Sequence, residues 1–256
     1  MIQHFRFGSP IRTDSVVQDI PVSSDAVPFL TADADGWVYT MAPDAIVYGL
    51  GEMPRGINKR GWHYVANNTD ESHHGENKVS YYGAHNFLLI DGGPGGDLFG
   101  VFVDFPGKVH YDIGYTVHDT LRFATEEPDY ELYILTGADL NDIAHQFRQL
   151  IGRSYIPPKW AFGLQQSRWG YKTAEDVREV ARQYKENDLP LDMICMDIDY
   201  MQDYADFTIN KERFPDLAAL AAELKAQGIR LVPIIDAGVR IDPKNPVCAE
   251  GLANGS

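Results

Sequence analysis

The sequence contains little cysteine and no recognisable metal-binding pattern. Only two cysteines, Cys195 and Cys248, occur among the 256 residues. No spacing of Cys and His in the chain is typical of a zinc site, so we expect no bound metal. Cys195 lies within an apolar segment and is interpreted as a small buried hydrophobe. A disulfide between the two cysteines is left open, since nothing in the sequence supports one.

Long apolar runs are also absent. No stretch approaches the roughly 20 apolar residues that a membrane-spanning helix needs. The first residues, MIQHFRFGSPIRTD, lack the apolar core of a secretory signal. We therefore expect a cytoplasmic protein that has no membrane partner.

Basic residues are outnumbered by acidic ones. The chain has 37 acidic and 22 basic residues, which gives a net charge of −15. An acidic surface repels phosphate backbones, so we expect no nucleic-acid partner. The excess is interpreted as a charge that maintains solubility rather than as an acidic functional patch. Hydrophobic residues make up 44% and charged residues 23% of the chain, a composition typical of globular proteins with a sizeable core.

The first part of the chain, residues 1–140, predicts an all-β domain. Short segments rich in Val, Ile, Tyr and Phe alternate with turn residues at a spacing of about ten residues, which favours an antiparallel sandwich or barrel. The segment DGGPGGD at 91–97 predicts a hairpin loop. Its glycines are not expected to bind phosphate, because no P-loop lysine or following helix is present. The predicted strands are GWVYTM, AIVYGL, HNFLLI, LFGVFVDF, KVHYDI, TLRFAT and YELYIL.

The pattern changes near Asp139. In LNDIAHQFRQLIG the apolar residues recur at helical spacing, and Gly152 is a suitable end for the helix. The double proline in YIPPKW interrupts the chain soon afterwards. We therefore predict a sandwich over residues 1–140 and a second domain over 141–256 that begins with a linker helix.

The second domain predicts an α/β fold. Strands at 161–167, 191–198 and 229–236 alternate with helices at 173–187 and 214–228, and Thr173 with Asp176 forms a capping-box pattern. This alternation is typical of a parallel sheet. A complete (β/α)₈ TIM barrel needs about 250 residues, whereas only 101 run from Ile156 to Ser256. We therefore expect an incomplete barrel of about three strands.

Ligands of parallel α/β folds bind beyond the carboxyl ends of the strands. Each predicted strand ends in polar or aromatic residues, which indicates a cleft lined by carboxylates and aromatic rings. The candidates are Arg168, Trp169 and Tyr171 after the first strand, Asp197, Asp199 and Tyr200 after the second, and Asp236 after the third.

Asp197 and Asp199 lie two residues apart, so an extended strand would place them on one face. Glycosidases need two carboxyls on either side of the scissile bond, about 5–5.5 Å apart for retention or about 6.5–9.5 Å for inversion. Two neighbours on one face do not meet this requirement. A substrate-holding role fits better, because a carboxylate accepts hydrogen bonds from sugar hydroxyls. The alternative is a structural pair bound to Arg or backbone donors. We expect Trp169 either to stack on a sugar ring or to pack between the domains.

Four stretches carry a family resemblance: VYGLGE, YYGAHNFLL, GRSYIPPKWAFGLQQSRWGY and LPLDMICMDIDYM. With these stretches the sequence resembles glycoside hydrolase family 31, and specifically its α-glucosidases. The resemblance covers nearly the whole chain. It implies a galactose-mutarotase-like β-sandwich followed by a (β/α)₈ barrel, and hydrolysis of α-glycosides with retention and without a cofactor.

The resemblance also implies site residues. Asp197 matches a sugar-binding aspartate, and Ile198 and Ile234 match apolar positions of the sugar pocket. Trp169 lies where a loop shapes the aglycone side. Asp70, in the segment NNTDESHHGENK, falls in a sandwich loop that family members extend over the active site. Glu71 or His73 is an alternative for that role, and a merely solvated loop is a further one.

The family nucleophile and acid/base follow the fourth and sixth barrel strands, and neither region exists in this chain. The resemblance therefore implies part of a retaining α-glucosidase that removes terminal glucose from small α-glucosides, and inactivity of the chain alone. Alternatives are an α-xylosidase or an α-glucan lyase of the same family, or a non-catalytic carbohydrate-binding module. Linkage preference and oligomeric state stay open.

Overall fold

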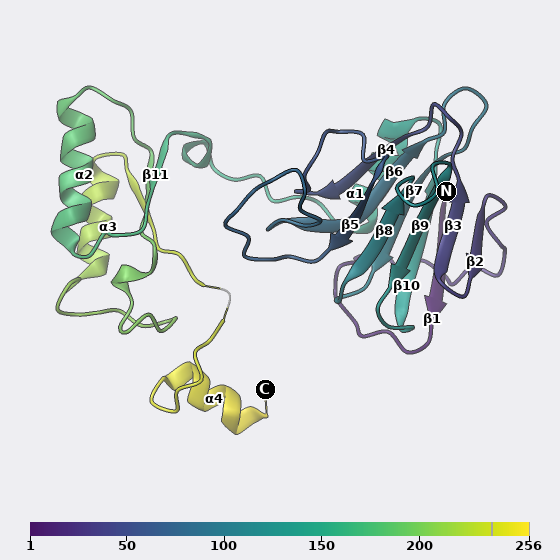
Figure 1. The fold of residues 1–256 in the computed structure, drawn as a ribbon. Coiled ribbons are helices and arrows are strands. Elements are labelled where there is room, and N and C mark those ends of the chain that lie inside the picture. Colours follow the sequence, from purple (N-terminus) through teal and green to yellow (C-terminus); the bar gives the residue numbers. More distant parts are fainter. Residues whose placement is uncertain (237, 256) are drawn as a thin grey trace. The chain divides into compact units, whose positions relative to one another are not determined.

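The computed structural model describes residues 1–236 and 238–255. The chain divides into two compact units, Met1–Ser154 and Tyr155–Ser256, each of which has its own core (Figure 1). Among the described residues, no helix combines the length and apolar character that crossing a bilayer requires.

The first unit contains two antiparallel sheets of five strands each. Side chains from both sheets, such as Leu88 and Phe99 on one and Tyr111 and Phe123 on the other, share one buried core. This arrangement confirms the predicted β-sandwich. The first sheet, in spatial order, consists of β1 (Ile2–Phe7), β10 (Tyr130–Thr136), β7 (Leu98–Asp104), β6 (Ala84–Asp91) and β4 (Ile46–Gly51). The second sheet consists of β2 (Leu30–Asp33), β3 (Gly36–Thr40), β9 (Thr120–Thr125), β8 (Val109–Ile113) and β5 (Trp62–Ala66).

Helix α1 (Leu140–Leu150) packs on the outer face of the first sheet. Asp139 caps its start by accepting a hydrogen bond from the backbone N–H of Asp142. Ile143 is buried against this sheet, and the ring of Phe147 stacks on Phe87 with centroids 3.7 Å apart. Because α1 buries its apolar stripe on the sandwich, the division between the units falls after Ser154, later than the predicted boundary at residue 140.

Residues 8–21, which we name the cover segment, belong to no helix or strand and lie over another part of the same outer face. The imidazole Nδ1 of His4 donates to the carbonyl of Ile20 at 2.7 Å, and the Thr13 hydroxyl donates to Asp104 at 2.7 Å. A cavity of about 950 Å³ lies between this segment and side chains that include His4, Asp104 and Glu131. Burial raises the pKa of the Asp104 carboxyl.

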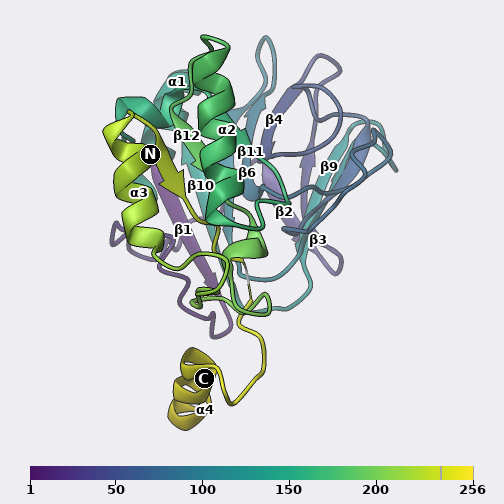
Figure 2. The ribbon, with the colours of Figure 1, turned by 90° about the vertical axis from the view of Figure 1, so that its left-hand side faces the viewer.

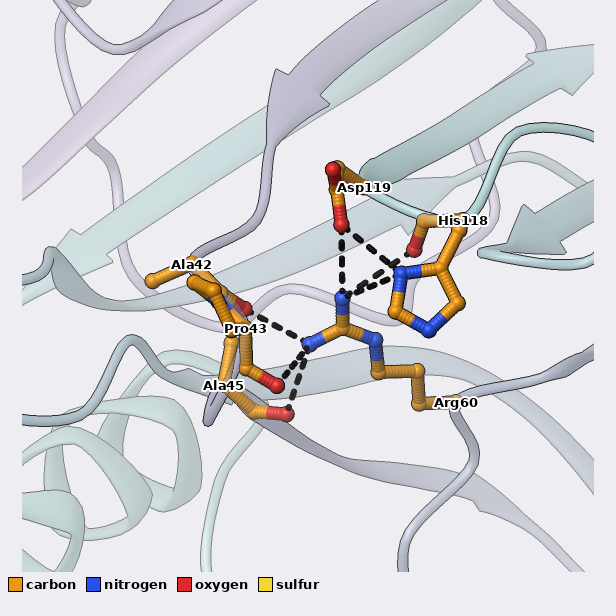
Figure 3. Close-up of polar contacts among 6 residues, drawn as sticks. All are labelled: Ala42, Pro43, Ala45, Arg60, His118 and Asp119. Atoms are coloured by element: carbon orange, nitrogen blue, oxygen red, sulfur yellow. Dashed lines mark hydrogen bonds and ion pairs between the residues drawn. The ribbon is translucent and has the colours of Figure 1, made fainter.

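Arg60 joins two turns at one end of the sandwich (Figure 3). Its side chain is only 10% exposed. The guanidinium donates to the carbonyls of Ala42 and Pro43 at 2.6 and 2.9 Å, in the turn between β3 and β4. It also donates to the carbonyl of His118 at 3.1 Å and to the Asp119 carboxylate at 3.2 Å, in the turn between β8 and β9. One buried cation therefore holds both turns together.

The second unit contains three parallel strands in the order β11 (Gln165–Ser167), β12 (Met193–Cys195) and β13 (Arg230–Val232). Helices α2 (Ala174–Glu186) and α3 (Leu217–Ala226) lie side by side over one face of this sheet (Figures 1 and 2). The predicted start of an α/β barrel is confirmed, and the described strands do not close into a barrel. The capping box at the start of α2 is present as predicted.

The strands of this unit are shorter than the sequence predicts. Lys159–Phe162 forms a 3₁₀ turn, η1, so the first strand begins only at Gln165. The second strand stops at Cys195, and the 3₁₀ turn η2 (Ile198–Tyr200) follows it. A further helix, α4 (Pro246–Asn254), is capped by Asn245 and was not predicted.

Candidate functional site

The chain leaves the extended conformation immediately after β12. Asp197 has φ +29° and ψ −163°, a backbone conformation that side-chain-bearing residues seldom adopt. Its carboxylate accepts a hydrogen bond from the backbone N–H of Ile198 at 2.8 Å. The prediction that Asp197 and Asp199 share a strand face is therefore wrong, because Asp197 ends the extended segment and Asp199 lies in the 3₁₀ turn.

The two acids lie in different environments. Asp199 is 4% exposed, and one of its oxygens accepts a 3.4 Å hydrogen bond from the hydroxyl of Tyr204. Its other oxygen has no partner among the described residues. Asp197 is only partly buried, and the backbone N–H of Ile198 engages one oxygen. Asp197 is thus the acid of this pair that a ligand can reach, and it keeps one carboxylate oxygen to bind it.

Three of the predicted site residues occupy equivalent positions on adjacent strands. Ser167 pairs with Cys195, and Cys195 pairs with Val232. Trp169, Asp197 and Ile234 each lie two residues beyond this paired row. The parallel register therefore brings all three to the carboxyl edge of the sheet. The strand ends predicted this placement for Trp169 and Asp197, and the family resemblance implied Ile234.

The side chains at this edge differ in exposure. Trp169 is 65% exposed and Ile234 is 41% exposed, so both present apolar surface to solvent. Ile198 is half-buried against the core of the unit. Tyr171, which the sequence also placed at a strand end, is instead buried in this core. The exposed or partly exposed candidates at this edge are therefore two carboxylates, Asp197 and Asp236, the guanidinium of Arg168, the indole of Trp169, and the aliphatic side chains of Ile198 and Ile234.

The end of β13 is tied to the segment after β12. The Tyr200 hydroxyl donates to the carbonyl of Ile234 at 2.7 Å. The backbone N–H of Asp236 donates to the carboxylate of Asp206 at 2.9 Å. Sequence reasoning placed Tyr200 in the cleft and missed Asp206, because no local pattern distinguishes this acid in the polar segment DYADFT.

Asp70 belongs to the other compact unit, where it lies in the loop between β5 and β6. It is exposed, and it accepts a 2.7 Å hydrogen bond from the Tyr82 hydroxyl, which raises the pKa of that tyrosine. Glu71 already accepts from the Lys78 ammonium at 2.7 Å and from the backbone N–H of His73 at 2.8 Å. Asp70 is therefore less engaged by cationic partners than Glu71.

In residues 1–236 and 238–255, no group of three or more His, Cys, Asp or Glu side chains is arranged to hold a metal ion. What the strand-end arrangement offers is hydrogen-bond acceptance from Asp197 beside apolar surfaces. That combination suits a ligand with both hydroxyl groups and apolar faces, as a sugar has.

Two family models match the chain. The model of the "Glycosyl hydrolase 31 N-terminal galactose mutarotase-like domain" matches residues 19–112, and that of the "Glycosyl hydrolases family 31 TIM-barrel domain" matches residues 154–256. Together they cover more than half of the chain, and they correspond to the sandwich and to the parallel sheet with its helices.

Individual relatives agree with the family models. Alpha-glucosidase 2 of Bacillus thermoamyloliquefaciens is 39% identical over 80% of this chain and 26% of the relative. Human intestinal sucrase-isomaltase is 31% identical over 84% of this chain and 12% of the relative. A solved structure of a family 31 dextranase from Flavobacterium johnsoniae, with isomaltotriose, is 25% identical and matches with a TM-score of 0.75 over 90% of this chain and 28% of that one.

The chain thus spans about a quarter or less of the length of these relatives. Within that span, both its sandwich and its parallel sheet match domains of one enzyme family, and the sequence resemblance to that family is confirmed. The chain belongs to glycosyl hydrolase family 31.

Proposed function

We propose that these residues form the sugar-holding part of a retaining α-glucosidase that removes terminal, non-reducing glucose from small α-glucosides. The observation that carries this proposal is the equivalent placement of Trp169, Asp197 and Ile234 beyond three adjacent strands of a family 31 barrel domain. The name and identity of the Bacillus relative support glucose as the sugar.

Each side chain has a distinct role in this proposal. The free oxygen of Asp197 accepts hydrogen bonds from glucose hydroxyls. Ile198 and Ile234 contact the apolar part of the sugar near its hydroxymethyl group. Trp169 offers its exposed ring to the next sugar unit. A part of Asp70 in sugar binding stays a prediction that the family resemblance alone implies.

The proposal also includes a division of labour. The chain matches 26% of the length of alpha-glucosidase 2, and we infer that the nucleophile and the general acid/base come from residues other than these 256. Retaining hydrolysis needs two such carboxyls about 5–5.5 Å apart. The chain alone is therefore expected to bind sugar without turning it over.

A chimera tests this proposal. This chain would be joined to the part of alpha-glucosidase 2 that follows the matched region, and hydrolysis of nitrophenyl α-glucoside would be measured. We expect activity from the chimera and none from the chain alone. Asp197→Ala should lower kcat/KM of the chimera by at least about tenfold, because a charged hydrogen bond is lost. Asp203→Asn, which removes an exposed carboxylate nearby, serves as the control.

A folded chimera that leaves both α-glucosides and α-xylosides intact would overturn the enzyme proposal. The same assay separates the alternatives, since an α-xylosidase prefers the xyloside and a lyase releases an unsaturated sugar instead of glucose. Binding of isomaltose to the chain, with an inactive chimera, would favour a carbohydrate-binding module. Location in the cytoplasm stays a prediction that cell fractionation would check.

A further inference from the structure

The segment Ile234–Asp236 lies beyond the last paired residue of β13. The ladder of the sheet ends with the pairing of Cys195 and Val232. Two hydrogen bonds then hold the segment. The Tyr200 hydroxyl donates to the carbonyl of Ile234 at 2.7 Å, and the Asp206 carboxylate accepts from the backbone N–H of Asp236 at 2.9 Å. We name Tyr200 and Asp206 the clamp.

Both clamp residues are buried. Asp206 is 2% exposed, and Tyr200 belongs to the core cluster of the unit, together with Phe214. Hydrogen bonds of such buried groups are shielded from competing water, and removing one partner leaves the other unsatisfied. The two bonds therefore restrict the segment more than the same bonds would at an exposed site.

The clamp is itself fixed by other elements. The backbone N–H of Asn210 donates to the carbonyl of Tyr200 at 2.8 Å. The Asn245 side-chain amide donates to the carbonyl of Asp206 at 3.3 Å. Asn245 also caps α4 by accepting from the backbone N–H of Val247 at 2.9 Å. The clamp residues that hold the segment are thus themselves fixed by hydrogen bonds from Asn210 and Asn245.

We propose that Tyr200 and Asp206 are positioning residues that fix Ile234 as a rigid wall of the sugar site, and that this wall distinguishes glucose from xylose. This inference rests on the proposed function. Glucose differs from xylose by one hydroxymethyl group, and a pocket separates ligands that differ by such a group by about 10–200-fold only when the pocket wall keeps its place.

The first measurement follows the clamp without any sugar. Amide hydrogen exchange of Asp236 would be measured in the unmodified chain and in its Asp206→Ala, Asp206→Asn and Asp203→Asn variants. Asp206→Ala should lower protection of this amide by about tenfold or more. Asp206→Asn keeps an acceptor oxygen and should retain most of the amide protection. The control Asp203→Asn should retain all of this protection. Unchanged protection in Asp206→Ala would overturn the clamp.

The second measurement compares sugars. Dissociation constants of methyl α-glucoside and methyl α-xyloside would be obtained by NMR titration of the unmodified chain and of its Asp206→Ala, Asp206→Asn and Tyr200→Phe variants. In Asp206→Ala and in Tyr200→Phe, the ratio of the two dissociation constants should fall toward one. In Asp206→Asn, which keeps an acceptor oxygen, the ratio should stay close to that of the unmodified chain. A loss of global stability alone would weaken both sugars equally and leave the ratio unchanged.

The possible failures are distinguishable. Lost amide protection with an unchanged ratio would overturn the selectivity role of the clamp while leaving the sugar site in place. If the unmodified chain bound neither sugar, the sugar site of the proposed function would fail, and the positioning role would fail with it. The amide exchange result would still report whether Asp206 holds Asp236.

Discussion

At the scale of single residues, Asp197 shows backbone strain. A residue with a side chain at φ +29° occupies a sparsely populated region, and such strain costs about 1–3 kcal/mol. Strained residues gather at functional sites, because the surrounding structure holds them there for a purpose other than stability. The strain at Asp197 therefore agrees with its proposed role in sugar binding.

Replacing Asp197 separates stability from binding. Glycine adopts this backbone conformation without strain, whereas alanine does not. We expect Asp197→Gly to be more stable than Asp197→Ala by about 1 kcal/mol, and both to lose sugar binding. Denaturant unfolding of the two variants checks the difference, and an equal or lower stability of the glycine variant would argue against strain at this position.

Arg60 stabilises the sandwich through its hydrogen bonds to two turns. Arg60→Met removes the donor to five carbonyl or carboxylate groups in two turns (Figure 3), and we expect a loss of about 3 kcal/mol in the free energy of unfolding. Arg60→Lys should lose less, because one ammonium reaches only some of these acceptors. The exposed Arg12 provides the control: Arg12→Met should leave the unfolding transition of the sandwich unchanged.

At the scale of elements, the sequence predicts seven of the ten strands of the sandwich and misses three. The segments HNFLLI and LFGVFVDF are found as β6 and β7, joined by the predicted glycine-rich hairpin loop. Strands β1, β2 and β5 were not predicted. IQHFRF and LTAD mix polar and charged residues with few apolar ones, and their pairing partners, rather than their own pattern, make them strands. WHYVA is mostly apolar, so its own composition could have indicated a strand.

The site shows the same limit. The alternation of strands and helices predicts a parallel sheet, and it places Trp169 and Asp197 correctly at one edge, where Ile234 also lies. The end of β12 could not be predicted, because a local backbone turn at Asp197 overrides the apolar run. The contacts of Tyr200 with Ile234 and of Asp206 with Asp236 join residues at least 30 positions apart, which a local pattern does not encode.

The start of helix α2 provides an element-scale test. Thr173 accepts from the backbone N–H of Asp176 at 3.2 Å, and Asp176 accepts in return from that of Thr173 at 2.8 Å. Thr173→Ala should destabilise the second unit by about 1 kcal/mol. The neighbouring exposed Lys172 serves as a control, since Lys172→Ala removes no cap; an equal loss in both variants would contradict the capping role.

The carboxyl of Asp104, beneath the cover segment, should make the stability of the sandwich depend on pH. Burial raises the pKa of Asp104 above its ordinary value of 3.8, although Thr13 donates to it. An acid that binds its proton more tightly when folded stabilises the folded state at low pH, and this contribution is lost as pH rises through the raised pKa. Asp104→Asn keeps an acceptor and cannot ionise. We expect it to be more stable than the parent at neutral pH and equally stable below 3.8, measured by denaturant unfolding; a constant difference would contradict this.

At the scale of the whole molecule, the chain consists of two units with separate cores. Residues between them, such as Tyr155 and Ile156, are exposed and precede two prolines. Exposed connecting segments of this kind are where proteases cut first. The structure therefore predicts that the two units unfold in separate steps.

Two experiments examine this independence. Limited proteolysis should cut near Tyr155 and leave a folded fragment that ends close to Ser154. In thermal unfolding, Arg60→Met should lower only the transition of the first unit, and Thr173→Ala only that of the second. A single transition that both substitutions shift would show that the units unfold together.

The short parallel sheet of the second unit has a practical consequence. Within the described residues, β11 and β13 each pair on one side only, which leaves backbone N–H and C=O groups along two edges. Such edges are templates for pairing with other chains, and Phe162 and Ile235 add exposed apolar surface next to them. At high protein concentration, we expect aggregation of the isolated chain to begin at these edges, where exposed apolar side chains lie next to unpaired backbone groups.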